Sequence, residues 1–311
     1  MELFWYPSSG KLLYSGVRIV WLGAAILVAS FELALSEQFS GTPAEACLAV
    51  NRNLSLGAQS PRTAARLRSS ERLLIVAIGS SSTVGLWVLR SAATYPEVMR
   101  QELVRLRSNA EIKVVNSGRI GDTIEGNVAR FKRDVFSHRP YLVVWQLGTN
   151  DIAWGGHPDA QLKNRVRQGV QMLKASGADV ILMDLQYAPM VLASPYYSSM
   201  EAIISEVARE EKVGLFSRFT LMRKSIEAGV SPSALVSWDG LHNTADGYDC
   251  IGRALARGVS NLVPQGFPQR KGPTSQRRQP ALGEEPQQVV LGQAKSADEL
   301  CVPRTLSELI P

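Results

Sequence analysis

The chain has 311 residues, of which 45% are hydrophobic and 20% are charged. This composition is typical of a soluble globular protein, and the length suffices for one good-sized domain with extensions. The net charge of +6 comes from basic residues that are dispersed or gathered in runs without interleaved aromatic side chains, such as residues 269–278. We therefore expect no nucleic-acid binding.

The N-terminal part has the pattern of an export signal. Lys11 and Arg18 precede the apolar residues 19–31, and the small residues Ala34 and Ser36 follow. A basic start, an apolar middle and a small-x-small end are typical of a secretory signal peptide. The apolar run is shorter than the roughly 20 residues of a full membrane span. We expect residues 1–36 to be a cleaved signal, with an uncleaved inner-membrane anchor as the alternative, and the remainder to be periplasmic or secreted.

After an N-terminal extension at residues 37–69, apolar runs and amphipathic segments alternate over a domain at residues 70–262. Strands are expected at residues 73–79, 112–118, 141–148, 178–186 and 213–217, and helices at residues 96–108, 123–135, 160–177, 200–212 and 244–263. Continuous apolar runs are typical of strands buried on both faces of a parallel sheet. The alternation predicts the α/β class, as a three-layer α/β/α sandwich with a mostly parallel sheet of about five strands.

Residues 263–311 are rich in Pro, Gln, Gly and basic residues and poor in apolar ones. Such a segment buries too little surface to fold alone, so we expect a disordered tail with a short apolar segment at its end. The three cysteines, Cys47, Cys250 and Cys301, lack the spacing of a zinc site. Cys47 and Cys301 both lie outside the core pattern and are the expected disulfide pair, with three unpaired thiols as the alternative.

Small and polar residues follow the expected strands at points far apart in the sequence. They form the strings GSSST (79–83), NSGRIGDT (116–123) and GTND (148–151), and WDGLH (238–242) precedes the last helix. Ligands of parallel α/β sheets bind beyond the carboxyl ends of the strands. The four strings are therefore expected to meet in one site.

The residue types in these strings favour nucleophilic catalysis. Ser81 lies at a strand-to-helix turn, where a hydroxyl is exposed, and it needs a general base to become nucleophilic. Asp239 and His242 are three residues apart, so the carboxylate can hold one ring nitrogen while the other faces Ser81. The other histidines, His138 and His157, lack such a partner.

The four strings resemble the four sequence blocks of the SGNH hydrolases, also called GDSL-type esterases and lipases. The resemblance implies a flavodoxin-like SGNH hydrolase fold with Ser81, Asp239 and His242 as the catalytic triad. It also implies an oxyanion hole made by Ser81, Gly118 and Asn150, whose N–H groups would stabilise the developing negative charge.

The first block departs from the family pattern, which usually has Gly-Asp-Ser. Ser80 stands at the position of the Asp, and Ser81 and Ser82 follow it. The alignment on Gly79 and Thr83 makes Ser81 the nucleophile, with Ser80 or Ser82 as the alternatives.

Further residues are candidates for the substrate pocket. Trp154 and Tyr187 follow the third and fourth strands, and His157 lies in the loop after the third string. Residues 79–85 contain neither the Gly-Lys-Ser/Thr string of a phosphate-binding loop nor the GxGxxG spacing of a dinucleotide site. Three scattered histidines do not form a catalytic metal pattern, so we expect no metal and no cofactor.

These observations predict a serine-dependent acyl-ester hydrolase that removes small acyl groups from carbohydrate or lipid esters through an acyl-enzyme. Its partner is then a small-molecule or polysaccharide ester. Two alternatives use the same cleft: a catalytically silent module that binds glycan or cell-wall polymer, and an O-acyltransferase. The sequence does not indicate an oligomeric state.

Overall fold

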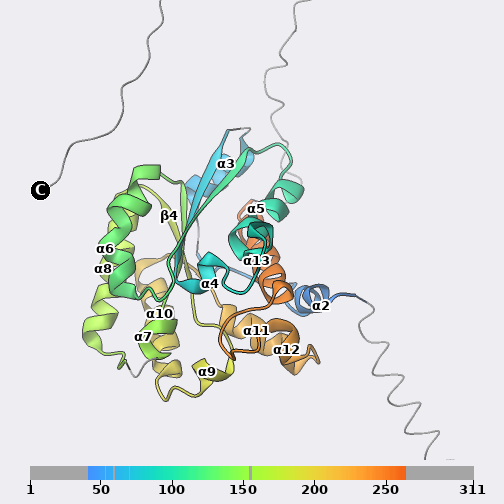
Figure 1. Cartoon of the computed structure of the whole chain (residues 1–311). Helices are drawn as coiled ribbons and strands as arrows, with labels where there is room; N and C mark the ends of the chain where they lie inside the picture. The colour runs from blue at the N-terminus through green and yellow to red at the C-terminus, as the bar shows by residue number, and fades with distance from the viewer. Residues whose placement is uncertain (1–40, 53, 59, 70, 154–155, 264–311) are drawn as a thin grey trace, which may run out of the picture. The chain divides into compact units, whose positions relative to one another are not determined.

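The computed structural model describes residues 41–52, 54–58, 60–69, 71–153 and 156–263, and these form the expected three-layer sandwich (Figure 1). The described strands are β1 (Leu73–Gly79), β2 (Ile112–Gly118), β3 (Leu142–Gln146), β4 (Asp179–Met183) and β5 (Gly214–Phe216). They pair in parallel in the order β2-β1-β3-β4-β5. The α/β class and the parallel five-stranded sheet are thereby confirmed.

Helices cover both faces of this sheet. The longer ones are α5 (Tyr95–Leu106), α6 (Ile124–Asp134), α8 (Ala160–Ala175), α10 (Tyr197–Glu211) and α13 (Ala245–Ser260). Shorter ones are α2 (Pro43–Val50), α3 (Pro61–Arg68), α4 (Ser81–Val84), α7 (Thr149–Ala153), α9 (Pro189–Leu192), α11 (Arg218–Glu227) and α12 (Pro232–Leu235), with 3-10 turns η1 (Ser91–Ala93) and η2 (Phe136–His138). In Figure 1, α5 and α13 lie on one face of the sheet, and α6 and α8 lie on the other.

The strand order fixes where a ligand site can form. Every residue of β1 is buried, because its apolar, largely β-branched or leucine side chains are covered on both faces. From β1 the chain passes outward to β2 and then returns across β1 to β3. In open parallel sheets such a reversal marks the place where ligands bind, here beyond the carboxyl ends of β1 and β3. Gly79 is paired with Gly118 at that end of the sheet.

A disulfide bond joins the N-terminal extension to the last helix. Cys47 of α2 is bonded to Cys250 of α13, with Cα atoms 6.1 Å apart. The expected pairing of Cys47 with Cys301 is therefore wrong, as is the alternative of three unpaired thiols. The extension was expected to lie outside the core, but Ala44, Cys47 and Leu48 are buried in it, which brings the two sulfurs together.

Several sequence predictions concern residues outside the described ones. The expected signal or anchor at residues 1–36, the tail from residue 264 onward and Cys301 all belong to this group. Over the part of the chain that the structure describes, no helix has the length and apolar character that a membrane crossing needs.

The carboxylate of Asp151 ties α7 to the start of α6. It accepts hydrogen bonds from the backbone N–H of Ile124 at 3.1 and 3.4 Å. Burial raises the pKa of Asp151 from 3.8 to about 6, although backbone hydrogen bonds from Ile124 and Gly148 oppose this shift. Because the folded pKa lies above the unfolded one, this group's contribution to stability is complete below pH 3.8 and is lost as pH rises through about 6.

Removal of the disulfide is expected to destabilise the domain. The bond joins cysteines 203 residues apart, and loop-closure entropy at this separation corresponds to at most about 5 kcal/mol. We expect the double variant Cys47→Ser/Cys250→Ser to lose about 3–5 kcal/mol of unfolding free energy, measured by chemical denaturation. Dithiothreitol is expected to bring the wild type to the same level and to leave the double variant unchanged. An unchanged wild type under reduction would contradict the stabilising role.

The substitution Asp151→Asn is expected to flatten part of the pH dependence of stability. The amide keeps an oxygen that accepts the Ile124 N–H, but it removes the charge whose burial is unfavourable. The wild type is expected to lose up to about 3 kcal/mol from this group between pH 4 and pH 7. Denaturation of both proteins at pH 4, 6 and 8 measures the difference. If the unfolding free energies of wild type and variant change with pH in parallel, Asp151 does not titrate as stated.

Candidate active site

Ser81, His242 and Asp239 form one chain of hydrogen bonds. Ser81 is the first residue of α4, directly after the turn that ends β1. Its Oγ lies 2.7 Å from His242 Nε2, and His242 Nδ1 lies 2.5 Å from Asp239 Oδ2. Ser81 is 6% exposed and His242 is 8% exposed. The structure therefore brings the three predicted triad residues together, and it does so in the order that general-base activation of a serine requires.

The loop around Asp239 fixes this carboxylate in place. The backbone N–H groups of Leu241 and His242 both donate to Asp239 Oδ1 at 3.0 Å. The indole Nε1–H of Trp87 donates to Oδ2 at 2.7 Å. Burial raises the pKa of Asp239, but the hydrogen bonds from the His242 ring, the two backbone amides and Trp87 outweigh it and lower the pKa to about 2. The carboxylate is thus ionised at neutral pH and can hold the imidazole through its Nδ1–H.

The three consecutive serines have different surroundings. Both the N–H and the hydroxyl of Ser80 donate to Gln146 Oε1, at 2.8 and 3.0 Å, and the hydroxyl of Thr83 donates to the same oxygen at 3.1 Å. The side chain of Ser82 is buried. Ser81 is the serine whose hydroxyl meets His242. Ser80, at the position of the family's Asp, thus points to a neutral amide at the end of β3.

The backbone N–H of Gly118, an expected oxyanion donor, has an acceptor within the protein. It donates to Asn116 Oδ1 at 3.0 Å. A Cβ atom at position 118 would lie 2.4 Å from the backbone nitrogen of Val84. The absence of a side chain at Gly118 therefore allows the end of β2 to pack against α4.

Gly121 occupies a different part of the same turn. Its φ is +74°, and a Cβ added there would meet no atom within 4 Å, so the residue borders open space. Asn150, the other expected oxyanion donor, uses its amide Nδ2 to donate to the carbonyl of Asp122 at 2.8 Å. Asn150 is therefore anchored beside Gly121, and its second amide hydrogen remains for another acceptor.

The expected pocket residues have other neighbours. His157 is exposed and its ring meets Tyr196 edge-on, with centroids 4.6 Å apart. Tyr187 is half-buried and meets Phe219 edge-on at 5.1 Å. Trp154 lies outside the described residues. Within the described part of the chain, the ring contacts of His157 and Tyr187 are thus with other aromatic residues and not with the triad.

A buried glutamine that the sequence motifs did not include connects two parts of the site. Gln186 follows β4, and its Nε2 donates to the carbonyl of Leu241 at 3.1 Å. Its Oε1 accepts from Thr149 Oγ1 at 2.9 Å and from Arg218 Nη2 at 2.7 Å. The side chain of Gln186 therefore fixes the position of the GTND turn relative to the loop before His242. A polar residue at the carboxyl end of a buried strand was the available signal for it.

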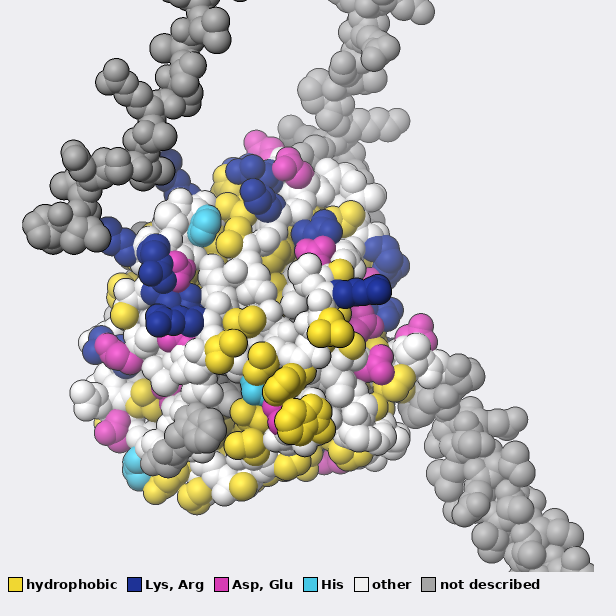
Figure 2. Space-filling model, in the orientation of Figure 1, with side chains coloured by type: hydrophobic (Ala, Val, Ile, Leu, Met, Phe, Trp, Pro, Cys, Tyr) yellow, Lys and Arg dark blue, Asp and Glu magenta, His cyan; other side chains and the backbone are white. Residues whose placement is uncertain are grey.

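Exposed aromatic side chains lie next to Asp239. Trp87 is 50% exposed and Trp238 is 83% exposed. Their rings are tilted against each other with centroids 5.2 Å apart. Figure 2 shows hydrophobic side chains gathered around a histidine and an acidic side chain on this face. The triad is thus bordered by apolar surface.

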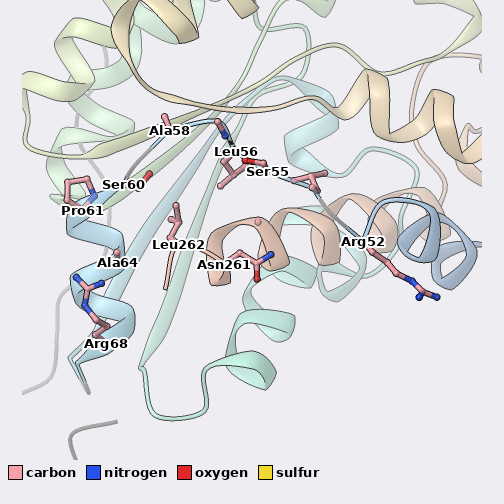
Figure 3. A pocket seen from close by; sticks show the side chains of 13 residues that line it. Arg52, Ser55, Leu56, Ala58, Ser60, Pro61, Ala64, Arg68, Asn261 and Leu262 are labelled. Atoms are coloured by element: carbon pink, nitrogen blue, oxygen red, sulfur yellow. Dashed lines mark hydrogen bonds between the residues drawn. The ribbon is translucent and has the colours of Figure 1, made fainter. Parts of the chain in front are cut away.

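A cavity of about 720 Å³ lies elsewhere, lined by residues 52, 54–58 and 60, by α3 and by the end of α13 with the residues that follow it (Figure 3). None of its lining residues belongs to the triad. The backbone N–H of Thr63 in α3 bonds Asp179, the first residue of β4, which places α3 toward the amino ends of the strands. Across the described ranges, no three His, Cys, Asp or Glu side chains are placed to hold a metal ion.

Comparison with known proteins identifies relatives of the whole domain. The model of the Non-GDSL lipase-like family matches residues 46–265. An arylesterase of Vibrio mimicus is 25% identical over 190 residues, which are 61% of this chain and 88% of the relative. Thioesterase 1/protease 1/lysophospholipase L1 of Escherichia coli K12 is 28% identical over 198 residues, 64% of this chain and 88% of the relative.

The solved structure of a two-domain esterase active on acetylated mannans has a TM-score of 0.58 and 18% identity, covering 70% of this chain and 58% of that one. At this identity the likeness concerns the fold. The family match spans more than half of the chain. The chain is an ester hydrolase related to the SGNH esterases, and it belongs to the Non-GDSL lipase-like family.

Proposed function

We propose that the protein hydrolyses acyl esters through an acyl-enzyme, with Ser81 as nucleophile, His242 as general base and Asp239 as the acid that orients it. The observation that carries this proposal is the continuous chain of hydrogen bonds from Ser81 Oγ to Asp239. A serine hydroxyl at its ordinary pKa is a weak nucleophile, and an adjacent imidazole activates it.

The geometry supports a two-step reaction. Ser81 Oγ attacks the ester carbonyl while His242 Nε2, 2.7 Å away, takes the hydroxyl proton. The tetrahedral intermediate collapses, and the imidazolium returns the proton to the leaving alcohol. Water then attacks the acyl-enzyme with the same proton transfers and releases the acid. The ionised Asp239 stabilises the imidazolium in both steps.

The oxyanion in this proposal is held by the N–H of Ser81, the side-chain amide of Asn150 and a glycine N–H of the turn at residues 116–123. We favour Gly121 over Gly118, because the N–H of Gly118 already donates to Asn116 and Asn150 is anchored beside Gly121. Loss of one such donor typically lowers the rate on the order of a hundred- to a thousand-fold.

The disulfide supports a location outside the cytoplasm. Disulfides persist in oxidising compartments and are rare in the cytosol. The bond between Cys47 and Cys250 therefore agrees with the export signal expected at residues 1–36. We propose that the enzyme is periplasmic or secreted, with anchoring by an uncleaved N-terminal segment as the alternative.

The proposed substrates are esters of small acyl groups, such as acetyl groups on carbohydrates or short acyl chains on lipids. The related enzymes are named an arylesterase and a thioesterase/lysophospholipase, so members of this group differ in the alcohol or thiol that leaves. An extracytoplasmic location favours cell-surface or environmental esters over intracellular thioesters.

The substitutions Ser81→Ala and His242→Ala are each expected to lower kcat on p-nitrophenyl acetate by about a thousand-fold or more, because each removes an obligatory partner in acylation. Ser82→Ala is the matched control: it removes a neighbouring buried hydroxyl and is expected to keep the rate within a few-fold. A phosphonate ester is expected to label the wild type at Ser81 and to leave Ser81→Ala unlabelled. Wild-type rates in both triad variants would refute the proposal, and labelling at Ser80 or Ser82 would move the nucleophile.

A panel of p-nitrophenyl esters with acyl chains of increasing length, together with acetylated sugars, tests the substrate class. We expect kcat/KM to be highest for acetyl or propionyl esters and to fall as the chain lengthens. Release of acetate from an acetylated sugar, measured directly, would support the carbohydrate esters. A maximum at long acyl chains would contradict the small acyl group and leave the serine mechanism intact.

A further inference from the structure

The indole of Trp87 donates to the same carboxylate oxygen that holds the catalytic histidine. Trp87 Nε1 lies 2.7 Å from Asp239 Oδ2, and His242 Nδ1 lies 2.5 Å from that atom. We propose that Trp87 is a positioning residue of the triad, which fixes the Asp239 carboxylate and thereby the orientation of the His242 ring. This inference rests on the proposed function of the triad.

The Trp87 bond completes the set of donors around Asp239. Oδ1 accepts two backbone N–H groups, from Leu241 and His242, within the loop itself. Oδ2 accepts from the His242 ring and from Trp87. The donors from the loop and the ring are local, at two and three residues' distance, whereas Trp87 is 152 residues away. Trp87 is therefore the donor that connects the Asp239 carboxylate to the segment that carries Ser81.

Two residues with left-handed backbone conformation place the indole of Trp87 beside Asp239. Gly85 ends α4 with φ of +86°, and Trp87 itself has φ of +71°. A left-handed conformation in a bulky residue is unfavourable and persists where the surroundings enforce it. The carbonyl of Leu86 between them accepts from the Tyr248 hydroxyl of α13 at 3.3 Å. The turn is thus anchored on the helix that follows the catalytic histidine.

This arrangement matters during the reaction. The bond between Ser81 Oγ and His242 Nε2 is broken once the proton has moved and the serine has become acylated. The Trp87–Asp239 bond involves neither reacting atom, so it continues to hold the acid loop against the nucleophile helix through both steps. Hydrogen bonds to charged groups are stronger than those between neutral groups, and a small error in orientation is costly in catalysis.

The competing explanation is that Trp87 merely covers the surface, since its ring packs against Trp238 at 5.2 Å. The substitution Trp87→Phe separates the two, because phenylalanine keeps an aromatic ring and lacks the N–H donor. We expect kcat on p-nitrophenyl acetate to fall about tenfold with KM changed less than twofold. Leu89→Ala is the control: it removes a fully exposed apolar side chain from the same turn and is expected to leave kcat and KM unchanged.

The outcome of these kinetics decides between the two roles. A thermal unfolding midpoint of Trp87→Phe close to that of the wild type would show that the lower kcat is not a loss of fold. A kcat within twofold of wild type, or an effect confined to KM, would overturn the positioning role.

A second measurement does not depend on esterase activity. In protein labelled with ¹⁵N-tryptophan, the indole resonance that disappears in Trp87→Phe identifies Trp87. We expect its proton to lie downfield, to exchange slowly with water, and to move upfield in Asp239→Asn, where the acceptor has lost its charge. A Trp87 resonance that exchanges freely and ignores Asp239→Asn would overturn the inference. If the wild type cleaves no ester but the resonance behaves as expected, the proposed function fails and the contact stands.

Discussion

The hydrogen bond between Ser81 and His242 joins two segments 161 residues apart, and the site exists only while both segments keep their places. Ser81 follows the fully buried strand β1, so its position is set by the centre of the sheet. His242 lies in a loop whose position depends on α13. That helix packs along α5 and is joined to α2 by a disulfide. The 2.7 Å distance between Ser81 and His242 thus depends on the packing of the core elements to which the two loops are attached.

Neutral amide side chains hold the turns at the carboxyl end of the sheet. Gln146 accepts from the turn before Ser81, Asn116 accepts from the end of β2, and Gln186 joins the GTND turn to the loop before His242. An amide both donates and accepts, so one side chain can satisfy two backbone segments in a buried place. It also brings no charge toward the proposed oxyanion position, where a further carboxylate would oppose the developing negative charge.

The sequence predicts features that depend on residues close together in the chain. The apolar runs predicted all five strands, and the three-residue spacing predicted the Asp239–His242 pair. It did not predict α11, whose buried face includes the polar residues Arg218 and Ser225 beside its apolar ones. Contacts between distant residues also stayed hidden: Cys47 with Cys250, and Trp87 with Asp239. These depend on how helices and turns pack, which a one-dimensional pattern does not contain.

Ser80, at the position of the family's Asp, has a hydrogen-bond partner, Gln146, at the end of the neighbouring strand β3. Gln146 Oε1 is an acceptor that already receives the N–H and hydroxyl of Ser80 and the hydroxyl of Thr83. An ionised carboxylate at position 80 offers acceptors alone, so it would face this oxygen without a proton between them. An Asp could replace Ser80 only if the amide of Gln146 turned its NH₂ group toward it, which would leave the other two donors without their acceptor. Ser80 and Gln146 are therefore a matched pair, and the departure in the first block follows from the chemistry of the neighbouring strand.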